Sequence, residues 1–187
     1  MGVGLVKPIV SVFTGVTELF GEVEFFFSGR FGAPDYVSPD LNFNQTGYYA
    51  KEMGTGLVRR IYSYPDLIKP AELYPLKLLT IDVENRWRVE GKRRVNIDPG
   101  YLSLAKLVLA TTKDNVHRIC IGEGVYAEVT LFFEKGGFHP WPWTYPDYAS
   151  DEYRMIFACI REIYRGQVRN GEQNTFKRTH SGPPVRK

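Results

Sequence analysis

Side chains that could bind or transform a ligand concentrate between Lys92 and Glu128. The cluster comprises Arg94, Asn96, Asp98, Lys113, Asp114, His117, Arg118 and Glu128. Guanidinium and ammonium groups donate charge-assisted hydrogen bonds to phosphate or carboxylate oxygens, so Arg94, Lys113 and Arg118 predict an anion site. An imidazole can donate or accept a proton near neutral pH, which makes His117 a candidate catalytic residue beside Asp98 and Glu128.

Two other interpretations of this cluster stay open. Asp98 and Glu128 could hold a hard divalent cation such as magnesium through their oxygens. Alternatively, the cluster forms only surface ion pairs, with Asp98 stabilising the turn before Pro99.

Two segments rich in aromatic residues offer rings that could close over a ligand. Residues 44–54 contain Tyr48 and Tyr49, and residues 141–148 contain Trp143 and Tyr145. Because such rings can stack on a base or a sugar, these four residues are predicted to bind the ligand. A structural clasp is the preferred interpretation for Trp141.

Familiar catalytic motifs are absent from the sequence. It contains no phosphate loop, dinucleotide-binding glycine motif, HExxH zinc motif, GxSxG elbow or CxxC pair, which disfavours the enzyme classes built on them. The three histidines are too few for a multi-histidine metal site. Cys120 and Cys159 each lie in an apolar segment, which predicts buried free thiols.

Composition and periodicity predict the elements that must position these residues. A length of 187 residues, with 43% hydrophobic and 24% charged, is typical of one globular domain. Apolar patterns predict strands over 8–13, 56–64, 106–112, 117–121 and 125–133, and helices over 16–31, 75–89 and 151–166. This order predicts an α+β fold, a two-layer sandwich with a mostly antiparallel sheet and about three helices packed on one face.

Several local signals sharpen this picture. Pro99 and Gly100 predict a tight turn after a short strand that begins at Val95. Lys77, Thr80 and Glu84 share one helix face, which the pattern favours as solvent-exposed, with Glu84 paired to Arg88, over a face that points toward a ligand. Ser150 is the expected N-cap of the last helix, and Gly166 its expected end.

The net charge of +3 arises from the end of the chain. Residues 167–187 contain five basic residues and one acidic residue, a charge of +4, so the remainder carries about −1. This segment lacks apolar periodicity, so we predict a domain over 1–166 and a basic disordered tail over 167–187. Such a tail can add weak affinity for polyanions, but nucleic acid is not the expected partner.

The chain resembles a domain-of-unknown-function family, the one numbered 4416. The stretches that carry the resemblance are TGYY (46–49), EMG (52–54), VNIDPGYL (95–102), KLVLA (106–110), KD (113–114), HRI (117–119), GVYAEVTL (124–131) and WTYPDY (143–148). They run in order from about residue 8 to about residue 165. The family implies no reaction, but these stretches are mostly polar or aromatic, which favours a functional pocket over a surface lattice of ion pairs.

The leading functional hypothesis is a protein that binds a phosphorylated or otherwise anionic small molecule. Whether it also turns that molecule over is left open. The alternative is a non-catalytic module that recognises a protein or RNA through the aromatic loop and the basic tail, and a homo-oligomer built on the aromatic surface is a third option. Neither a signal peptide nor an 18-residue apolar run is present, so we expect a cytoplasmic protein without a membrane partner.

Overall fold

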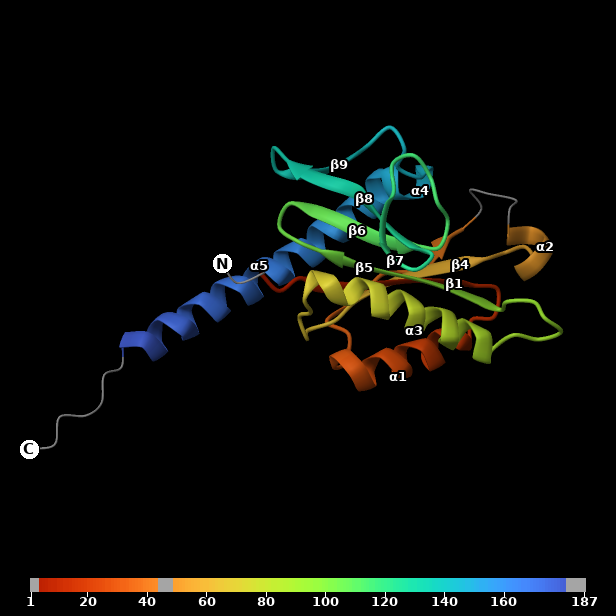
Figure 1. Ribbon diagram of the computed structural model, residues 1–187, viewed down its shortest axis with the longest axis horizontal. Helices are drawn as coiled ribbons and strands as arrows, with labels where there is room; N and C mark the ends of the chain where they lie inside the picture. The colour runs from red at the N-terminus through yellow and green to blue at the C-terminus, as the bar shows by residue number, and fades with distance from the viewer. Residues whose placement is uncertain (1–3, 44–48, 181–187) are drawn as a thin grey trace, which may run out of the picture.

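The computed structural model describes residues 4–43 and 49–180 (Figure 1), with only the backbone described at 50, 51 and 171–180. Its strands are β1 (Lys7–Thr14), β2 (Tyr36–Val37), β3 (Leu41–Asn42), β4 (Val58–Ser63), β5 (Val95–Leu102), β6 (Lys106–Thr111), β7 (Ile119–Gly122), β8 (Val125–Glu134) and β9 (Gly137–Pro140). Its helices are α1 (Leu19–Phe31), α2 (Ala50–Met53), α3 (Leu73–Arg86), α4 (Pro146–Ala149) and α5 (Asp151–His180), with a 3₁₀ turn η2 (Pro70–Glu72) before α3.

The described strands form one antiparallel sheet in the order β2-β4-β1-β5-β6-β8-β7. The short strand β3 also pairs with β4, and β9 pairs with β8. The predicted α+β class and the mostly antiparallel sheet are therefore confirmed.

Helices cover both faces of the sheet. In the central strand β1, alternation sends Val10 and Val12 to the face packed by α1 and α3, whereas Ile9 packs on the face covered by α5. The arrangement differs in this respect from the predicted one, in which all helices share one face. The last helix packs on its own face because its apolar stripe, which includes Phe157 and Ile160, meets the inward side chains of β4, β6 and β8.

The predicted turn at Pro99 and Gly100 is wrong, because both residues lie inside β5. That strand pairs with β1 along its whole length but with β6 only from Gly100 to Leu102. Pro99 therefore does not interrupt the ladder between β5 and β6, since no β6 residue pairs with it. At Gly100 a side chain would lie 2.4 Å from the carbonyl oxygen of Val108, so only glycine allows the two strands to approach.

The exposed face predicted for α3 is also wrong, since Lys77, Thr80 and Glu84 are all buried. The Glu84 carboxylate accepts a hydrogen bond of 2.6 Å from the Ile97 amide, and Lys77 Nζ donates to the Ile97 carbonyl at 3.1 Å. Two side chains of α3 thus take the place of a neighbouring strand where β5 and β6 diverge. A helix pattern alone does not show this, because the partner is a strand edge twenty residues further along the chain.

The last helix begins as predicted but does not end at Gly166. Ser150 Oγ accepts the N-cap hydrogen bond from the Tyr153 amide, whereas the helical backbone continues to His180, away from the sheet (Figure 1). Gln167 accepts a 2.9 Å hydrogen bond from the buried Lys7 and donates one to the Pro65 carbonyl. The packed part of the chain therefore reaches beyond residue 166, and disorder of the tail stays a prediction.

Both cysteines are exposed, so the prediction of buried thiols is wrong. Cys120 lies on the edge strand β7, and Cys159 lies on the outer side of α5. Among the described residues, no helix is long and apolar enough to cross a membrane.

Candidate functional site

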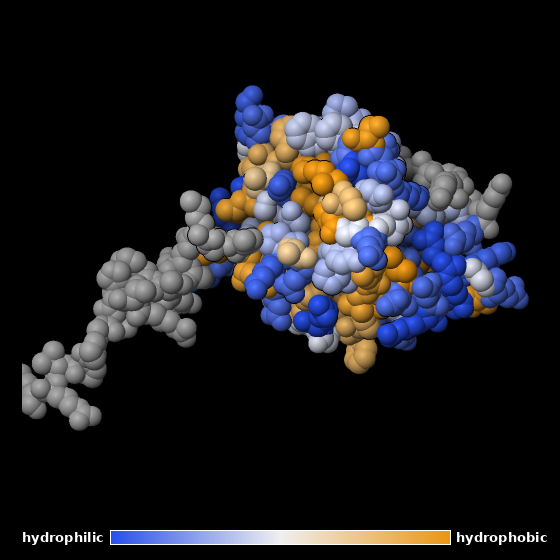
Figure 2. Space-filling model, viewed as in Figure 1, coloured by the Kyte–Doolittle hydropathy of each residue, from blue (hydrophilic) through white to orange (hydrophobic). Residues whose placement is uncertain are grey.

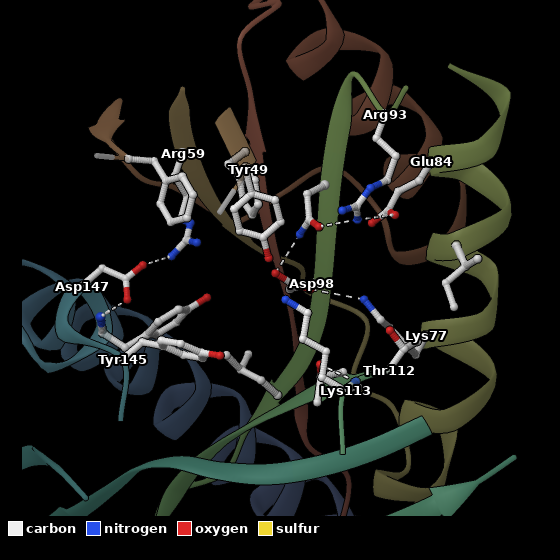
Figure 3. Close-up of a pocket in the computed structure, with 18 of the residues that line it drawn as sticks. Tyr49, Arg59, Lys77, Glu84, Arg93, Asp98, Thr112, Lys113, Tyr145 and Asp147 are labelled. Atoms are coloured by element: carbon white, nitrogen blue, oxygen red, sulfur yellow. Dashed lines mark hydrogen bonds and ion pairs between the residues drawn. The ribbon is translucent and has the colours of Figure 1, made fainter. Parts of the chain in front are cut away.

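A cavity of about 700 Å³ opens on the face of the sheet that also carries α5. Its charged lining residues are Glu52, Arg59, Lys77, Glu84, Arg88, Arg93, Asp98, Lys113, Arg118, Glu128 and Asp147. Figure 3 shows Arg59 and Asp147 on one side of it, Lys77, Glu84 and Arg93 on the other, and Tyr49, Asp98 and Lys113 between them. Hydrophilic residues gather over the end of the molecule that holds α2 and the end of α3 (Figure 2).

Strand register brings the floor of the cavity together. Phe13 of β1 pairs with Arg59 of β4 and with Asn96 of β5, and Ser11 pairs with Asp98. Because partners across an antiparallel ladder share a face, Arg59, Asn96 and Asp98 all project from one side of the sheet.

Glu128 reaches the same side because of an irregularity in β8. The register between β6 and β8 shifts after Leu107, which pairs with Leu131, whereas Val108 pairs with Val129. The extra residue in β8 is Thr130, and its hydroxyl donates to Glu128 Oε1 at 3.3 Å. Strict alternation along 125–133, as the sequence pattern predicts, therefore does not hold.

Arg59 is a buried cation surrounded by aromatic rings. Its Nη1 donates to Asp147 Oδ2 at 2.5 Å, and its guanidinium carbon lies 4.2 Å from the centre of the Phe43 ring. Its Nε is buried and has no hydrogen-bond partner within the described part of the chain. One donor of a buried guanidinium in the cavity wall thus lacks an acceptor among the described residues.

On the opposite side, Arg93 ties α2 to the end of α3. Its Nε and Nη2 donate to the two oxygens of Glu52 at 2.8 and 2.7 Å, and this hydrogen bonding lowers the pKa of Glu52. Its Nη1 donates to Asn96 Oδ1 at 2.9 Å. Burial raises the pKa of Glu84, although Lys77 and the Ile97 amide act in the opposite direction.

Asp98 lies between these two sides. Its Oδ1 accepts a hydrogen bond from Lys77 Nζ at 3.2 Å, and its Oδ2 accepts one from Asn96 Nδ2 at 2.8 Å. The side chain is 29% exposed, and it lines the cavity. Burial raises the pKa of Tyr49, and the nearby charge of Asp98 adds to this effect.

Glu128, Arg118 and His117 form a third group. Glu128 Oε2 accepts a hydrogen bond from Arg118 Nε at 2.8 Å and lies 3.2 Å from His117 Nε2. Arg118 Nη1 donates to the Lys113 carbonyl at 2.9 Å, which closes the loop between β6 and β7. The His117 ring stacks on Trp143, with centroids 5.4 Å apart, and neither ring lines the cavity.

The structure brings together most of the residues that the sequence singled out. Those that line the cavity are Tyr49, Asp98, Lys113, Arg118, Glu128 and Tyr145. Arg94 is not among the lining residues, and its carbonyl accepts a hydrogen bond from Thr14 Oγ1. Tyr48 lies outside the described residues. His117 lies behind Glu128, and Trp143 stacks on His117.

Sequence reasoning missed several charged residues of the cavity wall: Arg59, Lys77, Glu84, Arg93 and Asp147. The shared helix face of Lys77 and Glu84 was a usable signal. Asp147 lies in a stretch that carries the family resemblance, which was a second signal. Arg59 had none, because its aromatic neighbours come from distant segments.

The residues expected to bind magnesium already have partners. Both oxygens of Asp98 and both of Glu128 accept hydrogen bonds or lie against a cation. Within the part of the chain that the structure describes, no three His, Cys, Asp or Glu residues form a group that could hold a metal ion.

Comparison with known proteins agrees with the resemblance in the sequence. No curated protein and no solved structure matches the chain. A family model described as "Domain of unknown function (DUF4416)" matches residues 5–164, which include every described residue that lines the cavity. The chain therefore belongs to the DUF4416 family.

Proposed function

We propose that the cavity binds a small anionic molecule, such as a phosphorylated metabolite. The observation that carries this proposal is the set of six cationic side chains in its wall, Arg59, Lys77, Arg88, Arg93, Lys113 and Arg118, which outnumber its five carboxylates by one. A volume of about 700 Å³ lies within the range of small-molecule sites.

The six cations differ in how many hydrogen bonds they already make to neighbouring protein groups. Arg93 has three hydrogen bonds to side chains, and Lys77 spans Asp98 and the Ile97 carbonyl, so both hold the wall together. Arg59 keeps an unused Nε, and Arg118 Nη2 makes only a long contact of 3.5 Å to the Tyr145 hydroxyl. Arg59 and Arg118 are therefore the proposed anion-binding residues. Lys113 is added to them because its charged side chain lines the cavity.

Turnover of the ligand and a magnesium requirement stay predictions. In a reaction, Asp98 would face the ligand as a proton acceptor, whereas His117 would act on it only through Glu128. Magnesium would have to displace the present hydrogen bonds of Asp98 or Glu128, or arrive bound to the ligand's own oxygens.

A thermal-shift screen tests anion binding directly. The full chain is heated with nucleotides, sugar phosphates and carboxylates, each with and without magnesium. A ligand at 100 times its Kd stabilises the folded protein by about 2.7 kcal/mol. A binder supports the proposal, and a blank result with a cooperatively unfolding protein contradicts it.

Two lysines at the ends of β6 provide a matched pair of variants. Lys113 follows the strand and lines the cavity, whereas Lys106 begins it; both are exposed. Lys113→Gln should weaken binding of a phosphorylated ligand about 5- to 20-fold, through loss of one charge-assisted contact. Lys106→Gln should leave both binding and stability unchanged. Equal effects of the two variants would place the anion elsewhere.

The second candidate function is an interaction module. One observation favours it: Trp143 is 38% exposed and stacks between Trp141 and His117 outside the cavity. This function predicts a protein or RNA partner that is lost in Trp143→Ala, while binding of small anions stays unchanged.

A further inference from the structure

We infer that the ligand is a hydroxylated anion, a phosphorylated sugar or polyol, whose hydroxyl groups donate hydrogen bonds to Asp98 while its anionic group contacts Arg59 and Arg118. This inference rests on the proposed function and narrows it to one chemical class.

The first observation is that Asp98, one of five carboxylates in the cavity wall, can accept further hydrogen bonds. Asp98 faces the cavity, and each of its oxygens accepts one hydrogen bond from the protein. A carboxylate offers about four lone-pair sites, so further donors can still be accepted. A bare phosphate would bring its own negative charge next to the Asp98 carboxylate, which is unfavourable.

The second observation decides which kind of donor fits. Lys77 Nζ already lies 3.2 Å from Asp98 and neutralises it, and it is itself buried. A ligand ammonium group at Asp98 would place a second cation beside Lys77, which is unfavourable in a partly buried site. A neutral hydroxyl group donates without adding charge, so a sugar or polyol fits better than an amine.

The third observation is the separation of the two ends. Arg59 lies on β4 and Asp98 on β5, with β1 between them, and their partners Phe13 and Ser11 are two residues apart in β1. Two strand spacings and an offset of two residues place their backbones about 12 Å apart, before side chains extend toward each other. A phosphorylated sugar is long enough to place its anionic group at Arg59 and a hydroxyl group at Asp98.

Matched ligands test this inference on the unmodified chain. Glucose 6-phosphate, ribose 5-phosphate and glycerol 3-phosphate are compared by calorimetry with alkyl phosphates of similar size, such as cyclohexylmethyl phosphate, and with inorganic phosphate. One hydrogen bond to a charged acceptor corresponds to at least about a tenfold gain in affinity, so the best hydroxylated phosphate should bind at least tenfold more tightly than its alkyl counterpart. Equal or tighter binding of the alkyl phosphates overturns the inference.

Two isosteric substitutions, one in the cavity wall and one on the surface, test whether Asp98 accepts the hydrogen bonds of the ligand's hydroxyl groups. Asp98→Asn should reduce the affinity for the hydroxylated phosphate at least tenfold, and leave that for inorganic phosphate unchanged or increased, because a negative charge is removed. Asp82→Asn, on the exposed side of α3, should change neither of these two affinities. A preference for hydroxylated phosphates that persists in Asp98→Asn overturns the assignment.

Failure of the inference and failure of the proposed function give different results. If inorganic and alkyl phosphates bind as tightly as sugar phosphates, the cavity still binds anions, and only the hydroxyl preference is wrong. If none of these anions binds, the proposed function is wrong, and the inference falls with it.

Discussion

Glu84 illustrates how a single buried carboxylate in the cavity wall sets the pH dependence of stability. Its pKa is raised by burial, so the folded state holds its proton more tightly than the unfolded state does. The free energy of unfolding should therefore fall, through this group, as the pH rises from the unfolded pKa to the folded one.

Glu84→Gln removes this titration and should be measured by urea denaturation between pH 4 and pH 8. Relative to the variant, the wild type should lose stability as the pH rises above about 4.5, the usual pKa of a glutamic acid. The two proteins would keep a constant difference across this range if the pKa of Glu84 were the same in the folded and unfolded states.

Glu52 should behave in the opposite way and is the natural control. Its pKa is lowered by Arg93, so its contribution to stability is present above its unfolded pKa and is lost as the pH falls through the folded pKa. Glu52→Gln should accordingly be less stable than the wild type near pH 7, by up to about 1 kcal/mol, and should converge with it in acid.

Among the elements, the contact between β5 and β6 should tolerate no side chain at Gly100. An alanine Cβ would lie 2.4 Å from the Val108 carbonyl oxygen and 2.6 Å from a Leu109 methyl carbon. Gly100→Ala should cost about 1–3 kcal/mol, the usual range for overpacking, measured as a lower midpoint of chemical denaturation.

Gly21 in α1 serves as the control for that substitution. It is exposed, and an added Cβ would meet nothing within 4 Å. Gly21→Ala should raise stability by up to about 1 kcal/mol, because alanine is the better helix former. If Gly100→Ala also raised the stability, β5 and β6 would be less closely packed than the structure shows.

Elements with a strong internal pattern were predictable, and elements defined by a partner were not. The runs that became β1, α1 and β8 carry enough periodicity to be identified alone. The turn signal at Pro99 and Gly100 was misleading, because pairing with β1 keeps β5 straight through it. Short strands such as β2 and β3 exist only through their pairing with β4.

The residues of the candidate site also fall into a predictable group and an unpredictable one. Polar residues close together in the sequence, such as Arg118 and Glu128, were predicted as a group and do meet. Arg59 was missed because its burial depends on Phe43 and Asp147, which lie far away along the chain. Side-chain chemistry is local in sequence, whereas burial is a property of the whole fold.

At the scale of the whole molecule, the functional boundary of the folded body should lie between Gln167 and Asn170. Gln167 is one of three acceptors around the buried Lys7 amino group, with Asp35 and the Tyr64 carbonyl. A chain that ends at residue 166 should lose about 1–3 kcal/mol of stability, because Lys7 then lacks one buried partner.

A chain that ends at residue 170 should melt like the full chain and bind anions equally well. Thermal denaturation of the two truncated chains beside the full one separates these outcomes. Equal stability of the chains ending at 166 and 170 would show that Gln167 contributes nothing to the fold.

The use of α3 side chains in place of a strand beside β5 links ligand binding to local opening of the protein. If α3 separates from β5, Ile97 loses its partners Glu84 and Lys77, and the cavity loses part of its wall. Any ligand that binds only the closed form adds its binding free energy to the free energy of this opening. Amide hydrogen exchange at Ile97 therefore reports on occupancy of the cavity, and it slows as the ligand concentration rises above its Kd.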